Sequence, residues 1–192
     1  MNEKIMKKFA GLFLVAFAAV SMLNGQERND VIKFYNEGAK VLQTDVQAAI
    51  AAFENVVTMS EKVGESADDL KAKAVQVLPG LYVRAANNAI KENKPTDEII
   101  KAAKMAAAAA EKYNNAAGKD NASKIMVQAY NKMGTELFTA KDYDKAILAF
   151  DSLLAINPDY SNAIYNKALI YRSQNNSAAF EETIDLFLSK LE

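Results

Sequence analysis

The chain has 192 residues, of which 51% are hydrophobic, and its formal net charge is −1. Cysteine, histidine and tryptophan are absent, which excludes disulfides, thiolate nucleophiles, imidazole bases and zinc sites built from Cys or His. The near-neutral charge gives no reason to expect the concentrated basic surface that nucleic acids require. With only 7 Gly and 3 Pro, the composition favours one helical domain.

The first 25 residues have the composition of a secretory signal peptide. An N-terminal cluster of lysines precedes an apolar run at residues 9–23, and polar residues follow this run. A membrane anchor is the alternative, but a spanning helix needs about 20 apolar residues, which is longer than this run. We therefore expect cleavage after Gly25 and an exported, soluble protein consisting of residues 26–192.

Two helices are expected at the start of this domain. The first covers residues 31–43 with Asp30 as its N-cap. Thr44 and Gln47 have the spacing of a capping box and would begin the second helix. This helix would continue to about Val63 and end at the glycine that follows.

A third and a fourth helix follow. The third begins near Ser66 and Asp69, and we expect Pro79 with Gly80 to kink or break it. The fourth covers residues 97–113 and contains an alanine run of high helix propensity. This run could form a groove for a partner helix or a thin helix packed closely against its neighbours, and we favour close packing.

The second half of the domain is predicted to contain four more helices. Residues 114–121 are expected to form a loop, and the fifth and sixth helices run from about Ser123 to Ile156. A seventh helix begins at Ser161 and an eighth at about Ser177. The last helix carries an apolar stripe that would cover the open end of a helix stack. Its members are Phe180, Ile184, Phe187, Leu188 and Leu191.

Residues 127–160 carry the most specific pattern in the chain. Bulky residues flank a small one in each of two helices with the spacing of a helix-turn-helix repeat, and a proline follows the second helix. These residues are Tyr130, Met133, Gly134 and Leu137, then Ala146 and Phe150, and finally Pro158. The segment resembles a tetratricopeptide repeat. Gly134 and Ala146 would be the positions where two antiparallel helices touch, and the bulky residues would fill the space around them.

A small residue recurs at the equivalent position of each expected hairpin. These residues are Gly38, Ala86, Gly134 and Ala168. Their intervals are 48, 48 and 34 residues, and only the last is the standard repeat length. The longer intervals predict about two additional turns on each of two helices. In the second hairpin, Ala106 or Ala107 would replace the phenylalanine. The approximate repeats are 30–63, 67–113, 123–158 and 161–192.

The resemblance implies an all-α fold, a right-handed α-α superhelix of about eight antiparallel helices. The first helix of each repeat would line a concave face that holds peptides or proteins. The corresponding positions are Tyr35 and Ala39, then Val83 and Asn87, then Gln128, Asn131 and Thr135, and finally Asn162, Tyr165 and Leu169.

Three of these positions, Tyr35, Asn131 and Tyr165, are the strongest candidates for partner contacts. Tyrosine combines apolar area with a hydrogen-bonding tip, and an amide can pair with a peptide backbone in both directions. The alternative is that the tyrosines pack between hairpins. No Lys and Asn clamp for a C-terminal carboxylate occupies these positions, which disfavours binding of chaperone tails.

The sequence therefore predicts a non-enzymatic adaptor or scaffold that binds a protein or peptide in a bacterial cell envelope, in the periplasm or after secretion. No cofactor, metal or nucleic acid is expected. The alternative is a structural subunit that homo-oligomerises through its alanine-rich hairpin and C-terminal helix. Catalysis is disfavoured, because Asp142 and Asp144 would point to different sides of a helix. Glu181 and Glu182 would lie in a first turn, where the helix dipole favours acids.

Overall fold

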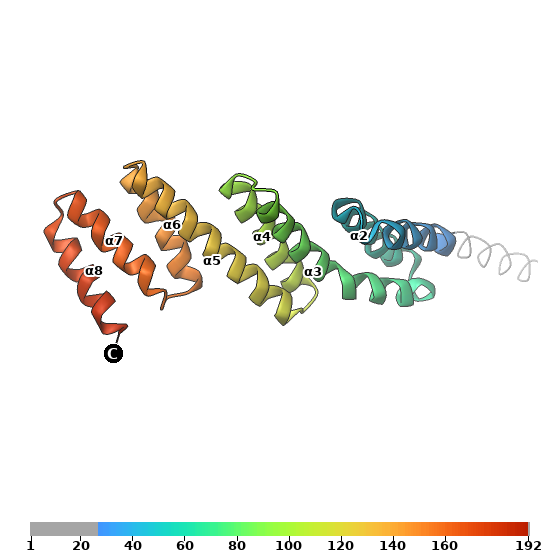
Figure 1. Cartoon of the computed structure of the whole chain (residues 1–192). Coiled ribbons are helices and arrows are strands. Elements are labelled where there is room, and N and C mark those ends of the chain that lie inside the picture. The colour runs from blue at the N-terminus through green and yellow to red at the C-terminus, as the bar shows by residue number, and fades with distance from the viewer. Residues whose placement is uncertain (1–26, 192) are drawn as a thin grey trace, which may run out of the picture. The chain divides into compact units, whose positions relative to one another are not determined.

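The computed structural model describes residues 27–191, which are helical apart from short connections and contain no strand (Figure 1). The all-α prediction is confirmed for these residues. The chain divides into two compact units, Met1–Leu81 and Tyr82–Glu192. The expected signal peptide lies outside the described residues. Within them, no helix combines the length and the apolar character needed to cross a membrane.

The described part of unit 1 consists of helices and one 3-10 turn. A helical segment covers residues 27–41, and it is followed by α2 (Val46–Val63), the turn η1 (Glu65–Ala67) and the beginning of α3 (Asp68–Lys91). The predicted end of α2 is confirmed. Gly64 ends this helix with φ 80° and ψ −156°, a backbone conformation that favours glycine.

The starts of the first two helices differ from the prediction. Asp30 lies inside the first helix, which already includes residues 27–30. α2 is capped by Asp45, whose carboxylate accepts a hydrogen bond from the Ala48 amide at 2.9 Å. Thr44 Oγ1 instead donates to the Val41 carbonyl at 3.5 Å. A carboxylate satisfies the free amides and also interacts favourably with the helix dipole, which explains why Asp45 takes the cap.

Pro79 was predicted to kink or break α3, and the break is wrong, because α3 continues through Pro79 to Lys91. Leu78 and Pro79 are both fully buried, and Leu81 is nearly so. Burial of these side chains offsets the hydrogen bond that proline removes from the helix. α3 also begins at Asp68 rather than near Ser66, since the residues before it form the 3-10 turn.

Unit 2 begins within α3 and continues as a series of helical hairpins. Its helices are α4 (Thr96–Lys112), α5 (Ala116–Thr139), α6 (Tyr143–Ile156), α7 (Ser161–Ser173) and α8 (Ser177–Ser189). Successive helices run in opposite directions, and each of α5, α6, α7 and α8 contacts the helix before it (Figure 1). The predicted end of α6 and the predicted starts of α7 and α8 are confirmed.

The predicted loop at 114–121 is mostly helix. α5 begins at Ala116, and the N-cap Asn115 accepts a hydrogen bond through Oδ1 from the Gly118 amide at 2.6 Å. Gly118 is buried, and a methyl group there would lie 3.1 Å from Ala110 Cβ. Small and polar residues that suggest a loop therefore form a capped helix start that packs closely on α4.

Four helix connections in unit 2 share one backbone device. Each places a residue in the left-handed region, with φ between 52° and 60°, at Asn93, Asn114, Lys141 and Asn175. The amide of the next residue then bonds back to a carbonyl in the last turn of the helix, as Asp142 does to Leu137 at 2.9 Å. This is the hydrogen-bond pattern of a Schellman motif, which ends a helix and reverses the chain.

Long hairpins precede compact ones, as the residue intervals predict, but the added length is unevenly divided. α3 and α5 have 24 residues each and α7 has 13, a difference of about three turns. α2 and α4 have 18 and 17 residues and α6 has 14, a difference of about one turn. The prediction of two extra turns on each helix is therefore corrected: most of the added length lies in α3 and α5.

One register position recurs in the second helix of every hairpin. The eighth residues of α2, α4, α6 and α8 are Phe53, Ala103, Phe150 and Ile184. The phenylalanines face glycines across the hairpin: a Cβ on Gly38 would lie 3.1 Å from the Phe53 ring. Ala103, rather than Ala106 or Ala107, thus takes the phenylalanine position of the second hairpin.

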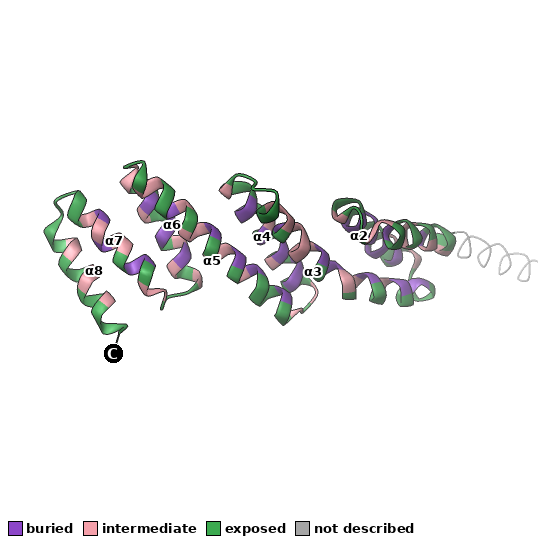
Figure 2. Ribbon diagram, in the orientation of Figure 1, coloured by how far each residue is buried: buried purple, intermediate pink, exposed green. Residues whose placement is uncertain are grey.

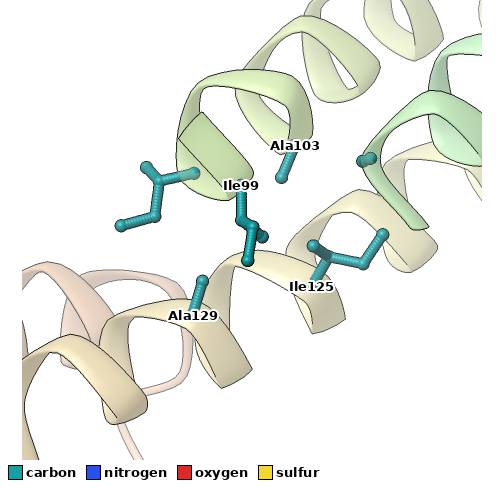
Figure 3. Packing of buried hydrophobic residues seen from close by; sticks show 6 residues of the cluster. Ile99, Ala103, Ile125 and Ala129 are labelled. Atoms are coloured by element: carbon teal, nitrogen blue, oxygen red, sulfur yellow. The ribbon is translucent and has the colours of Figure 1, made fainter. Parts of the chain in front are cut away.

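The second hairpin compensates for this small residue with isoleucines. Ile99 and Ala103 of α4 point toward Ile125 and Ala129 of α5 (Figure 3). Ala86 of α3 belongs to the same buried cluster. The alanine run of α4 continues this packing, because the following members Ala106, Ala109 and Ala110 are buried. Close packing of the run is confirmed.

The apolar stripe of α8 is only partly covered. No residue of α8 is buried, and Figure 2 shows only exposed and intermediate residues along it. Phe180, Ile184 and Phe187 are half-buried, whereas Leu188 and Leu191 are 53% and 62% exposed. The stripe therefore does not act as a closed cap: it packs on one side and leaves leucines uncovered on the other.

Candidate functional site

The predicted partner contacts on α5 share one face of the helix. Gln128, Asn131 and Thr135 follow one another at spacings of three and four residues, which places them one above the other. Gln128 and Thr135 are exposed and Asn131 is half-buried. Thr135 Oγ1 donates to the Asn131 carbonyl at 2.8 Å, so its hydroxyl remains available to a partner mainly as an acceptor.

The predicted contacts on α7 are more exposed. Asn162 is exposed, and Tyr165 is 41% exposed while its ring packs on Phe187 of α8 at a centroid distance of 5.2 Å. Leu169 is half-buried. α5 and α7 contact each other, so both helices belong to one continuous part of unit 2. The exposed side chains at the predicted positions of these two helices are amides, a hydroxyl and an aromatic ring, all uncharged.

The remaining predicted positions lie elsewhere. In unit 1, Tyr35 is half-buried and meets Phe53 edge-on, with ring centroids 5.6 Å apart, while Lys73 Nζ lies 5.9 Å from its ring. Its apolar part is therefore used inside the unit, and Ala39 is exposed. In unit 2, Val83 packs against the cluster around Ala103, and Asn87 is exposed.

A pocket of about 750 Å³ lies beside the predicted face, and the sequence patterns did not indicate it. It forms where the α3–α4 connection meets the last turns of α5 and the start of α6. Its apolar lining comes from Pro95, Met133, Leu137 and Ala140, and its polar lining from Asn93, Lys94, Thr96, Asp97, Lys132, Glu136 and Lys145. Residues from three separate segments build this pocket, so no single motif could have revealed it.

Internal contacts already engage several of the charged groups around this pocket. Glu136 accepts a hydrogen bond from Thr96 Oγ1 at 3.5 Å and pairs with Lys132 at 3.8 Å. The Lys145 ammonium donates to Asp142 at 2.8 Å and holds the pKa of that carboxyl below its ordinary value of 3.8. Asp142 therefore serves as a charged partner at the start of α6.

A second pocket, of about 430 Å³, lies between α6, α7 and α8. It is lined by Leu154, Ile164, Lys167, Tyr171, Ala179, Glu182, Thr183 and Leu186. None of the ten predicted positions lines either pocket. The predicted contacts thus lie on open helix faces, which suits an extended partner better than a small molecule.

The hairpin of α5 and α6 agrees with a known repeat family. Residues 127–160, from within α5 to the start of the α6–α7 connection, match the family model described as tetratricopeptide repeat. The match begins after the first turns of α5, so it covers only part of this hairpin.

Two solved structures are similar to parts of this chain. The crystal structure of MamA protein is 19% identical, with 83% of this chain and 88% of that chain covered and a TM-score of 0.30. The TPR2AB domain of yeast Sti1, described as a complex with pHSP90, is 15% identical, with coverages of 88% and 78% and a TM-score of 0.33. No curated protein has significant similarity to the sequence.

Proposed function

We propose that this protein is a non-enzymatic adaptor or scaffold, which binds a protein or peptide along the faces of α5 and α7 in unit 2. The tetratricopeptide repeat at residues 127–160 is the observation that carries this proposal. Its first helix presents Gln128, Asn131 and Thr135 on one face, and Asn162 and Tyr165 extend the same chemistry on α7. Tyr35 is a further predicted contact on unit 1.

The chemistry of this face favours binding over catalysis. Amide side chains can donate to and accept from the backbone of an extended peptide, and a half-exposed tyrosine adds apolar area. Asp142 and Asp144 accept hydrogen bonds from Lys145 and Gln174, which supports a structural role for these acids. We therefore assign no catalytic residue.

We further propose that the protein is exported to the periplasm of a bacterial cell. This rests on the lysine cluster and the apolar run at residues 9–23. Mass spectrometry of the protein purified from cells tests it: loss of residues 1–25 and a new N-terminus at Gln26 are expected. A retained apolar run in the membrane fraction would instead identify an anchor.

The alternative of a self-assembling subunit is disfavoured by the packing of the alanine-rich hairpin. Ala106, Ala109 and Ala110 are buried between helices of their own chain, so they offer little surface to a second copy. A monomer at micromolar concentration is expected by sedimentation. An oligomer that dissociates when α4 is altered would restore this alternative.

Affinity capture from the cell envelope tests the adaptor function. The test variant combines Gln128→Ala, Asn131→Ala and Asn162→Ala, because Tyr35 and Tyr165 also pack on neighbouring rings. The control variant combines Glu98→Ala, Lys101→Ala and Glu111→Ala on the exposed side of α4. A distinct protein that the wild type and the control recover, and that the test variant loses, is the expected result. Equal recovery by all three would exclude this face.

A further inference from the structure

A second surface of unit 2 has the features of a docking site, and it is distinct from the α5 and α7 faces. We call it the α8 outer face and define it by Ile184, Asp185 and Leu188. Leu188 is 53% exposed and Ile184 is half-buried. The two residues are one helical turn apart and lie on the same side of α8, with Asp185 beside them. Leu191, which follows the C-cap residue of the helix, is 62% exposed.

The equivalent positions of α6 are covered by the next helix. Leu154 is the twelfth residue of α6, as Leu188 is of α8, and Asp151 is the ninth, as Asp185 is of α8. Leu154 packs against the core cluster that includes Ala163 and Ile170 of α7. Asp151 Oδ1 forms an ion pair with Lys167 Nζ of α7 at a distance of 2.5 Å. In α6, this leucine and aspartate pair therefore receives an amphipathic helix that carries a lysine.

α8 presents the same pair without the covering helix. In the part of the chain that the structure describes, no cation pairs with Asp185, and Glu181 one turn earlier adds a second acidic group to the same edge. The comparison with α6 therefore indicates that a helix fits this face of α8. The two carboxylates indicate that such a helix carries basic side chains.

Contacts at both ends of α8 hold the α8 outer face in place. The Asn176 side chain caps the start of α8 by accepting from the Ala179 amide at 3.2 Å. At the other end, Lys190 Nζ pairs with Asp159 in the α6–α7 connection at 2.7 Å. Phe187 packs on Tyr165 of α7. A surface ordered before binding loses less conformational entropy when a partner docks.

We propose that the α8 outer face binds an amphipathic helix of a partner protein. Its apolar stripe packs on Ile184 and Leu188, and a lysine or arginine on its flank pairs with Asp185. The partner helix thus takes the place that α7 takes on α6. This binding mode is a helix laid against an apolar helix face, and it does not depend on an extended peptide along α5 and α7.

Calorimetric titration of the full chain, purified as cells process it, tests the proposal with two synthetic peptides. Both are 21-residue alanine-based helices with one leucine stripe, flanked by lysines in the first peptide and by glutamates in the second. Binding of the lysine peptide is expected. Leu188→Ser should weaken it about tenfold, because the stripe loses its apolar contact. Leu148→Ser, which alters a leucine that is 64% exposed on α6, is the matched control and should bind as the wild type does.

The charge assignment is tested by reversal. Asp185→Lys should weaken the lysine peptide and favour the glutamate peptide, each by about tenfold. Equal affinity of both peptides for the wild type, or no effect of Leu188→Ser, would overturn the proposal. Self-association without peptide that Leu188→Ser abolishes would also overturn it, since a second copy would then be the occupant. The Gln128→Ala, Asn131→Ala and Asn162→Ala variant should keep peptide binding, which separates this surface from the proposed adaptor face.

Discussion

The ring of Phe150 in α6 reaches the backbone of α5 at Gly134. A methyl group on Gly134 would lie 2.7 Å from Cε1 and Cζ of that ring, closer than real side-chain atoms approach. Phe150 is fully buried, so the ring has no free space into which it could move. The two helices of this hairpin therefore require glycine at this point.

Substitution of Gly134 tests this contact. Gly134→Ala should lower the free energy of unfolding by about 1 to 3 kcal/mol as an overpacking change, and Gly134→Leu by at least as much. Urea unfolding measures both. Gly80→Ala is the control, because no atom lies within 4 Å of the added methyl group, and it should stabilise α3 by about 0.5 to 1 kcal/mol. An unchanged urea midpoint for Gly134→Leu would contradict the close contact of α5 and α6 at Gly134.

Gly64 is required for a different reason, its backbone conformation. With φ 80° and ψ −156°, it occupies a region that is almost restricted to glycine. Gly64→Ala should destabilise unit 1 by about 1 to 3 kcal/mol, although nothing lies within 4 Å of the new methyl group. Thermal unfolding followed by circular dichroism measures the change. Ser66→Ala, at an exposed position nearby, is the control. If Gly64→Ala lowers the stability no more than this control does, residue 64 does not require glycine.

At Lys141, replacement by glycine should raise stability instead of lowering it. This lysine occupies the left-handed backbone position of the α5–α6 connection. Its φ is 60°, whereas asparagine holds three of the four such positions described above. Lys141→Gly should stabilise the protein by about 0.5 to 1 kcal/mol, since relief of the left-handed strain exceeds the entropy gained by the unfolded chain. Lys141→Val should destabilise it. Melting midpoints in the reverse order would show that this connection is not left-handed.

The pairing of Arg28 with Asp69 predicts a dependence on pH. The guanidinium donates to Asp69 at 2.8 Å and holds the pKa of that carboxyl below its ordinary value of 3.8. Because the folded pKa is lower than the unfolded one, the stabilisation is present above pH 3.8 and is lost as the pH falls through the folded pKa. In Arg28→Gln, a carbon-detected NMR titration should show the pKa of Asp69 moved upward. An unmoved titration would mean that the pair does not form in solution.

Tyr165 combines a packing role with a predicted role in binding, and two variants separate them. Tyr165→Phe keeps the ring contact with Phe187 and removes the hydroxyl, so it should leave the melting midpoint unchanged and weaken partner capture. Tyr165→Ala also removes the aromatic pair and should cost about 0.5 to 1.5 kcal/mol of stability beyond the lost burial. If Tyr165→Phe captures the partner as well as the wild type, the hydroxyl is not a contact.

Local signals in the sequence were sufficient for much of the fold. The ends of α2 and α6 and the starts of α7 and α8 agree with the prediction, because each is marked by a glycine, a proline or a polar cap within a few residues. The spacing of Gly134 and Phe150 also predicted a hairpin, since both residues of this contact lie within one repeat.

The errors share a cause, which is that a residue's neighbours in space were unknown. Pro79 was expected to kink or break α3, but the helix continues through it, and its surroundings are buried. Gly118 suggested a loop, but a close approach by Ala110 explains it. Of the candidate site, the α5 face followed from helical spacing alone, whereas the pocket lined by Pro95, Met133 and Lys145 required three segments to meet.

The sequence by itself determined that this chain forms helices, that they pair as hairpins and that residues 127–160 resemble a tetratricopeptide repeat. These properties depend on helix propensity and on contacts between residues close along the chain. Only the tertiary structure decided which apolar residues are covered. Leu154 and Leu188 hold the same register position on two similar helices, and one is packed while the other is exposed. Burial depends on whether another helix lies alongside, and no local pattern encodes that.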